Sequence, residues 1–205
     1  MNKKEKLKEF HRSNIIEVAK KLFIEKGVIQ TSMDEIAKEA DYSKSTLYAY
    51  FKSKDEIYSY IVYENTLLLK QAIVDAIKNN ETLEAAFMAI CEAHVSFYDN
   101  YPLYFESMIG SITEAQDDSS PIYRMVFELG EEINKVIMDF LDKRIKMKQV
   151  RPDIDTLQTA FALWAGICGL IIMTNNKSSY IDCMKVSKQD FLSYGFKTYL
   201  NSILI

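Results

Sequence analysis

The sequence predicts an all-α protein of about nine helices, and two observations carry this prediction. Only 6 glycines and 3 prolines interrupt the 205 residues, fewer than average usage would supply. Apolar residues also recur three and four positions apart along most of the chain, the spacing of one helical face. With 48% hydrophobic residues, the chain can bury a substantial core in one or two domains.

A first helix is expected to end near Gly27, because a glycine in the left-handed region often terminates a helix. The residues before it place apolar side chains at spacings of three, four, seven and eight. The members of this face are Ile15, Val18, Ala19, Leu22 and Phe23.

Two short helices should follow. Ser32 with Glu35 forms a capping box that opens a helix over about residues 33–40. Ser43 is a favoured N-cap for a second helix over residues 44–51. Two short helices joined by a tight turn and packed on a first helix describe a helix-turn-helix.

A long fourth helix is expected from the capping box of Ser53 and Glu56 to about Lys78. The stretch before it, residues 42–54, reads "YSKSTLYAYFKSK" and could pass for a strand, since Thr, Tyr and Phe favour sheets. The capping serines on both sides favour a helix instead.

Helical placement sorts this stretch into two faces. Leu47 and Phe51 share the side that points into the core, and Ser45 and Ala49 lie opposite them. The outward centre is therefore small and its rim carries hydroxyl groups. Such a face suits a helix in a DNA major groove, with hydroxyls and lysines reaching phosphates on either side.

Charge is distributed unevenly along the chain. Residues 1–54 contain 12 Lys and Arg against 8 Asp and Glu, whereas residues 55–205 contain 13 against 21. A basic N-terminal quarter on an acidic body is consistent with a polyanion-binding module. It is also consistent with a charged, solvated tail, and charge alone leaves both interpretations open.

Residues 15–57 resemble the DNA-binding domain of the tetracycline-repressor (TetR) family. The resemblance rests on "LFIEKG", "TSMDEIA", "SKSTLYAYF" and "KSK" at the family's spacing. It implies that Thr31 and Ser32 hold phosphates and that Tyr48 and Tyr50 donate hydroxyls to the DNA backbone. It further implies that Lys54 binds a phosphate together with the N-terminus of the fourth helix.

By the same resemblance, the recognition helix begins at Ser43, and Lys44, Ser45 and Thr46 lie closest to the bases. Two positions depart from the family, which often has glycine where this chain has Asp41 and Ser45. Asp tolerates a left-handed turn better than most residues. Ser45 adds a side chain where backbone meets the groove, so base preference is expected to differ from that of relatives with glycine.

The rest of the chain is predicted to be a helical ligand-binding and dimerisation domain. We place the DNA-binding domain at residues 1–54 and this second domain at residues 55–205. Methionines and aromatic residues gather in its predicted fifth to eighth helices, which in the resembling family enclose a ligand pocket. The candidate ligand-binding residues are Phe87, Cys91, His94, Tyr101, Tyr104, Phe105, Met108, Tyr123, Phe127 and Trp164.

Most of these candidates also fit a simpler interpretation, since a methionine and aromatic stripe at helical spacing is more often plain core. His94 lies on the apolar stripe and is expected to be either a hydrogen-bonded core histidine or a polar anchor for the ligand. Cys91 and His94 lie on adjacent turns of one helix, but two ligands are too few for a metal site. We therefore expect neither a metal nor another cofactor.

The helix containing "FALWAGICGLIIM" is apolar nearly all round, so one protein face cannot be its only partner. Its run from 160 to 173 is shorter than the 20 or so residues that a membrane span needs, so we expect no membrane insertion. Small residues on this helix and aromatic residues on the last one favour a homodimer through the last two helices. These are Ala165, Gly166, Gly169, Phe191, Phe196 and Tyr199.

The leading functional prediction is a ligand-responsive DNA-binding transcriptional repressor, which leaves its operator when a ligand binds the second domain. Its partners would be an inverted-repeat operator in double-stranded DNA and a small hydrophobic or aromatic effector. The alternative is a helical small-molecule or protein-binding module without operator function. An enzyme is disfavoured, because only two histidines are present and neither lies in a spacing typical of catalysis.

A cytoplasmic location is expected from two features. The start "MNKKEKLKEF" is charged and no apolar segment of a signal peptide follows it. Cys91, Cys168 and Cys183 are an odd number without close spacing, which disfavours a disulfide framework or a zinc finger.

Overall fold

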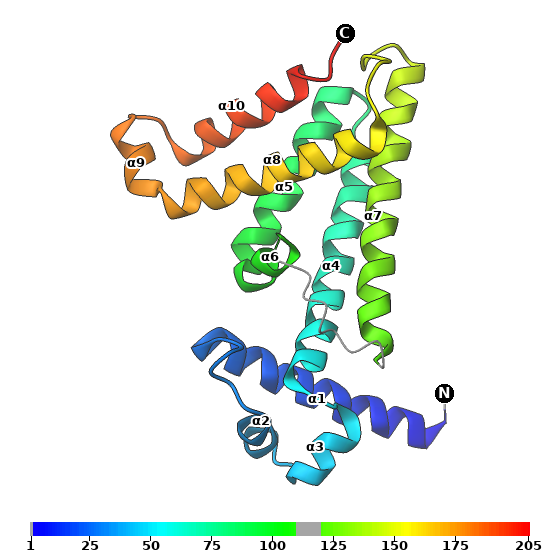
Figure 1. The fold of residues 1–205 in the computed structure, drawn as a ribbon, viewed down its shortest axis with the longest axis vertical. Coiled ribbons are helices and arrows are strands. Elements are labelled where there is room, and N and C mark those ends of the chain that lie inside the picture. The colour runs from blue at the N-terminus through cyan, green and yellow to red at the C-terminus, as the bar shows by residue number, and fades with distance from the viewer. Residues whose placement is uncertain (1, 110–119) are drawn as a thin grey trace. The chain divides into compact units, whose positions relative to one another are not determined.

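The computed structural model describes residues 2–109 and 120–205, in which every regular element is a helix (Figure 1). The ten helices of the described residues are α1 (Lys3–Lys26), α2 (Met33–Glu39), α3 (Lys44–Tyr50), α4 (Lys54–Asn79), α5 (Leu83–Asn100), α6 (Pro102–Ile109), α7 (Pro121–Lys146), α8 (Thr156–Asn176), α9 (Ser178–Cys183) and α10 (Lys188–Asn201). The predicted all-α class is confirmed. The described residues contain one more helix than expected, because a six-residue helix, α9, separates the last two long helices.

The described residues form two compact units. The first comprises 2–65 with 120–128, and the second comprises 66–109 with 129–205. Helices α4 and α7 contribute residues to both units. The predicted domain boundary between residues 54 and 55 separates functions rather than compact units. It stays a prediction, because the compact units do not test it.

Helix α1 is anchored in the first unit by one buried face. Ile15 and Ala19 are fully buried and Phe23 is 1% exposed, as the apolar spacing predicts. The helix ends at Gly27, whose φ of 83° lies in the left-handed region and whose N–H donates to the Phe23 carbonyl.

The turn between α2 and α3 is a Schellman motif with an unusual residue at its centre. Tyr42 N–H donates to the Ala37 carbonyl at 2.9 Å, and Asp41 N–H donates to the Lys38 carbonyl at 3.2 Å. Asp41 adopts φ 59°, the left-handed conformation that favours glycine. The tight helix-turn-helix connection therefore rests on an aspartate that accepts this conformation.

The second unit packs α5, α8 and α10 around one apolar core. Leu163, Ile167 and Ile171 of α8 meet Phe196 and Leu200 of α10 within it. Close approach of the two helices depends on glycine. A Cβ at Gly195 would lie 2.3 Å from Leu170 Cδ2, and one at Gly166 would lie 2.9 Å from the Tyr199 ring.

Helix α8 stands out because only part of it is covered. It is long and apolar enough to cross a membrane by length and composition, and 28% of that window is buried. Core helices of soluble proteins pass the same test, so this feature is weak evidence for a membrane. It does show that one apolar face of α8 is open in the single chain.

Replacing Asp41 tests the turn between α2 and α3. Asp41→Val should destabilise the fold by about 1–2 kcal/mol, because a β-branched residue strains the left-handed conformation. Asp41→Gly should not destabilise it, and Asp41→Asn, which removes only the charge, should stay close to wild type. Urea unfolding midpoints measure all three, and a valine variant as stable as the glycine variant would contradict this account of the turn.

Candidate nucleic-acid interface and effector site

Helix α3 presents the two faces that the sequence predicts. Leu47 is fully buried and Phe51, which follows the helix, is 1% exposed. Ser45 and Ala49 are exposed on the other side, and Tyr48 is 46% exposed. The outward face is therefore small at its centre, with a tyrosine at its edge.

Three hydroxyl groups meet at the N-terminus of α3. Ser43 Oγ accepts from the N–H of Thr46 at 3.1 Å, which makes it the N-cap. The same oxygen lies 2.9 Å from Ser45 Oγ and 2.8 Å from Thr46 Oγ1. The predicted base-reading residues Ser45 and Thr46 are thus held in a hydroxyl cluster, at a helix end whose dipole favours anions.

Lys44 sits at the same helix end in an exposed ion pair. Its Nζ lies 2.7 Å from Asp34 Oδ1 of α2, and both side chains are more than 60% exposed. The hydrogen bond to Asp34 raises the pKa of Lys44, so the amine stays charged. An exposed pair of this kind is weak, so a phosphate or a base edge can compete for the lysine.

Ser32 lies where the resemblance expects it, but Thr31 does not. Ser32 is exposed at the start of α2, with its Oγ 2.9 Å from Glu35 Oε2 in the predicted capping box. The Thr31 side chain is 2% exposed, and its hydroxyl donates to the Gly27 carbonyl at 2.8 Å. Thr31 therefore holds the end of α1, and its buried hydroxyl does not face a phosphate in this structure.

Lys54 also differs from its expected place. Its Nζ donates to the carbonyls of Val28, Ile29 and Thr31 at 2.8, 3.0 and 3.0 Å. These three bonds use every donor of the ammonium group. The structure thus ties Lys54 to the loop before α2, where the resemblance implies a phosphate contact.

Tyr50 is half-buried, and its ring lies near that of His11 on α1. The His11 ring lies 6.0 Å from the Tyr50 ring, and His11 Nδ1 is hydrogen-bonded to the Tyr42 hydroxyl at 2.6 Å. Neither His11 nor Tyr42 was predicted to have a role. Their contact joins residues 31 positions apart, so no local sequence pattern could predict it.

The candidate effector residues of the second unit form a closed core. Phe87, Cys91, His94, Tyr104 and Phe105 are all buried. Tyr101 and Trp164 are partly buried against the same cluster. The ring centroids of Phe97 and Tyr101 lie 5.3 Å apart, and those of Tyr98 and Phe105 lie 5.2 Å apart. These side chains pack on one another as a core does.

Three of the candidates stand apart from that cluster. Phe127 is 65% exposed, so it does not line an enclosed cavity in this structure. Tyr123 is half-buried and belongs to the first unit. The side chain of Met108 lies outside the described residues.

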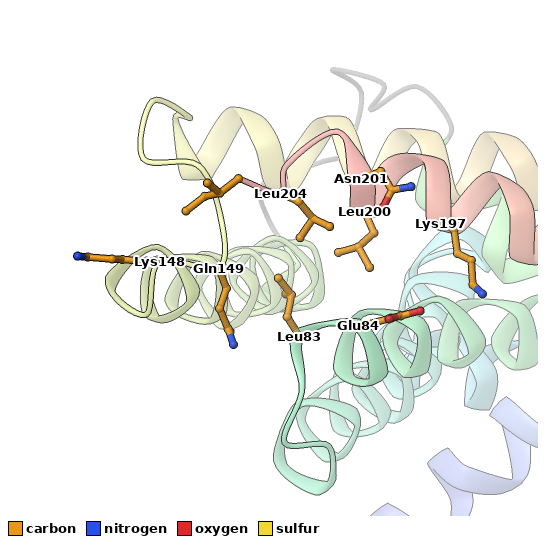
Figure 2. Close-up of a pocket in the computed structure, with 9 residues that line it drawn as sticks. Leu83, Glu84, Lys148, Gln149, Lys197, Leu200, Asn201 and Leu204 are labelled. Atoms are coloured by element: carbon orange, nitrogen blue, oxygen red, sulfur yellow. The ribbon is translucent and has the colours of Figure 1, made fainter.

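A groove of about 450 Å³ opens elsewhere in the second unit, and none of the candidates lines it. Its apolar part is made by Leu83, Leu200 and Leu204, whose side chains converge in Figure 2. Glu84, Gln149 and Lys197 supply polar groups at its edge. The predicted pocket and this groove are therefore different places.

Burial sets the chemistry of the titratable groups in the core. It lowers the pKa of His94, whose Nδ1 is hydrogen-bonded to the Ile90 carbonyl at 2.8 Å, so the imidazole is neutral. Burial also raises the pKa of the Cys91 thiol, and that of Cys168 to about 12. Both thiols stay protonated and behave as small apolar groups. Among the described residues, no three His, Cys, Asp or Glu side chains come together as metal ligands would.

The buried His94 should make stability sensitive to acid. Its folded pKa lies below the ordinary 6.5, so below pH 6.5 the unfolded chain binds a proton that the folded chain does not. Stability should fall by up to about 1.4 kcal/mol per pH unit from there towards the folded pKa. Urea unfolding at pH 7.5 and 5.5 should show a smaller loss for His94→Gln than for wild type. The control His11→Gln should keep the larger loss, and equal losses in all three proteins would refute the role of His94.

Comparisons with known proteins agree with the helix-turn-helix. Residues 15–61 match the family model described as bacterial regulatory proteins, tetR family. The negative transcriptional regulator IcaR of the biofilm operon icaADBC in Staphylococcus aureus is 28% identical over 155 residues, 73% of this chain and 79% of the relative. An uncharacterised helix-turn-helix regulator, YhgD of Bacillus subtilis, is 26% identical over 153 residues, 73% of this chain and 76% of the relative.

Solved structures share the fold along nearly the whole chain. FadR of Bacillus subtilis in complex with stearoyl-CoA superposes with a TM-score of 0.65 at 17% identity, covering 92% of this chain and 95% of that one. The sequence motifs, the helix-turn-helix geometry and the all-helical second unit therefore agree, and residues 15–61 match the DNA-binding domain of the tetR family of bacterial regulatory proteins.

Proposed function

We propose that this chain is a transcriptional repressor that binds an inverted-repeat operator and leaves it when a small molecule binds the second domain. The observation that carries the proposal is the outward face of α3. Ser45 and Ala49 leave space there for the groove, while buried Leu47 fixes the helix from behind. The relative IcaR is a negative transcriptional regulator, which supports repression rather than activation. Access to the chromosome requires a cytoplasmic protein.

Contacts to DNA are assigned by exposure. Lys44, Ser45 and Thr46 at the start of α3 are proposed to read bases, with Ser43 fixing their geometry as the N-cap. Tyr48 at the edge of the face and Ser32 at the start of α2 are proposed to bind phosphates, and Tyr50 has only part of its side chain available. Thr31 is left out because its hydroxyl is buried.

The effector is proposed to be an apolar or aromatic molecule. The candidate residues are packed together in this structure, so the effector must select a state in which that core is open. A long apolar molecule fits this requirement, and FadR of Bacillus subtilis, with the same fold, binds stearoyl-CoA. To release the operator, the effector must favour the open state by about 100-fold, or about 2.7 kcal/mol.

The open face of α8 is proposed to be the dimer interface, together with α10. Phe161 and Met173 are 45% and 46% exposed on α8, with Ala165 and Gly169 exposed between them. Tyr194 on α10 is 75% exposed. A second copy would cover these apolar side chains, and the pair would place two recognition helices on the two halves of an inverted repeat.

Salt dependence tests the DNA interface. Random double-stranded DNA enriched on the purified protein should yield a fragment whose logarithmic affinity falls linearly with the logarithm of salt concentration. Tyr48→Phe should weaken the binding of that fragment and of unrelated DNA alike, because it removes a contact to the DNA backbone. Lys44→Ala should weaken the binding of the enriched fragment more than the binding of unrelated DNA.

Lys135→Ala, which removes an exposed lysine of α7 in the second unit, serves as the control and should change neither affinity. If no fragment is enriched, the chain is a binding module without operator function and the proposal fails.

A charge on α8 tests the dimer. A Cβ at Gly169 meets nothing within 4 Å in the single chain, so Gly169→Glu fits the folded subunit but places a carboxylate in the proposed interface. Sedimentation should then give a monomer with unchanged helix content. Gly130→Glu is the matched control, since Gly130 of α7 is also open, and it should remain a dimer. A dimeric Gly169→Glu would place the interface elsewhere.

A further inference from the structure

The first residue of α4 is bound to a loop far away in the sequence. Lys54 Nζ donates to the carbonyls of Val28, Ile29 and Thr31 at 2.8–3.0 Å. The loop lies 23–26 residues earlier, between α1 and α2. A charged donor makes stronger hydrogen bonds than a neutral one, so three such bonds form a firm attachment.

The same loop is closed from its other side by Thr31. Its buried hydroxyl donates to the carbonyl of Gly27, the residue that ends α1. Thr31 therefore forms two hydrogen bonds: its hydroxyl donates to the end of α1, and its carbonyl accepts from Lys54. Ser32, the N-cap of α2, follows immediately. Fixing the loop thus fixes where α2 begins.

The start of α2 in turn bears on the recognition helix. Asp34 in the first turn of α2 pairs with Lys44 at the start of α3. The α2–α3 turn is closed by its own backbone hydrogen bonds, so the two short helices move as a pair. A displacement of the loop would therefore be passed to the DNA-facing residues.

The first turn of α4 also holds a second attachment. The Glu56 carboxylate is 8% exposed and accepts from Lys52 N–H at 2.6 Å and from the hydroxyl of Ser120 at 2.7 Å. Ser120 immediately precedes α7. One helical turn thus connects the α1–α2 loop, the end of the helix-turn-helix and the beginning of α7, all within the first unit.

We infer that Lys54 is a positioning residue, which sets the α1–α2 loop and the start of α2 against the first turn of α4. This inference rests on the proposed function for its effect on DNA, but the attachment itself exists without DNA. Its three donors point to backbone carbonyls, so a phosphate would have to break these bonds before Lys54 could bind it. The cation keeps the recognition helix in place, and exposed groups make the phosphate contacts.

Two substitutions separate the two roles. Lys54→Arg keeps the charge and binds phosphate at least as well, but a planar guanidinium cannot replace three converging bonds of an ammonium. Lys54→Met keeps the length of the side chain and removes all donors. Circular dichroism first establishes that each variant is folded, and thermal unfolding without DNA follows. Both variants should lose about 3 °C or more in Tm, and the amide of Ser32 should exchange faster.

DNA binding is then compared across salt concentrations. Both variants should bind about tenfold more weakly with the salt slope of wild type, because the number of phosphate contacts is unchanged. Tyr48→Phe serves as the comparison, since it should leave Tm unchanged. A phosphate role for Lys54 predicts the opposite pattern: Lys54→Met keeps the Tm of wild type and lowers the slope by about 0.9, and Lys54→Arg restores it.

That opposite pattern would overturn the inference, as would unchanged Tm and amide exchange in both variants. If a variant does not fold, hydrogen exchange of the Lys54 ammonium protons in the wild-type protein decides. These protons should exchange slowly and remain slow when DNA is added, and fast exchange in either state would overturn the inference. If the wild type binds no DNA, the proposed function fails, while Tm and amide exchange still test the attachment of Lys54 to the loop.

Discussion

A seven-residue helix does not stay folded alone in water, and the DNA-facing unit depends on two of them, α2 and α3. The folded state of α2 and α3 must therefore be stabilised by contacts with other parts of the chain. Leu47 and Phe51 supply such contacts, and both side chains are almost completely buried. The Arg12 guanidinium lies 3.8 Å from the centroid of the Tyr60 ring and 5.1 Å from that of Phe51, which ties α1 to the segment after α3. The recognition surface is thus held by the side chains behind it.

This dependence divides the side chains of the helix-turn-helix into two groups. A hydroxyl or ammonium that completes the fold has its hydrogen bonds already made, and Thr31 and Lys54 are of this kind. A side chain whose polar atoms face solvent, such as Tyr48, or form only an exposed ion pair, such as Lys44, can bind DNA instead at little cost. Residue type alone does not tell the groups apart, because a lysine or threonine serves in either.

Sequence patterns predicted the parts of this molecule that depend on neighbours within a few residues. The caps at Ser32 and Ser43 and the two faces of α3 follow from spacing, and the structure confirms them. The bonds of Lys54 and the contact between His11 and Tyr42 join segments more than 20 residues apart, which spacing cannot reveal. For the same reason, the aromatic stripe predicted the burial of Phe87 and Phe105 correctly, but it could not distinguish a packed core from a ligand pocket.

The second unit shows how an apolar helix can satisfy two demands at once. Ile167 and Ile171 of α8 complete the core with α10, while Phe161 and Met173 remain open to solvent. Glycine permits the inner packing, because Gly166 and Gly195 leave room for Tyr199 and Leu170. The outer face then offers apolar area that the single chain leaves uncovered, so covering it with a second copy would bury surface without rearranging the core. An effector that opens the core would disturb α8 from behind, and with it the face that we propose as the dimer interface.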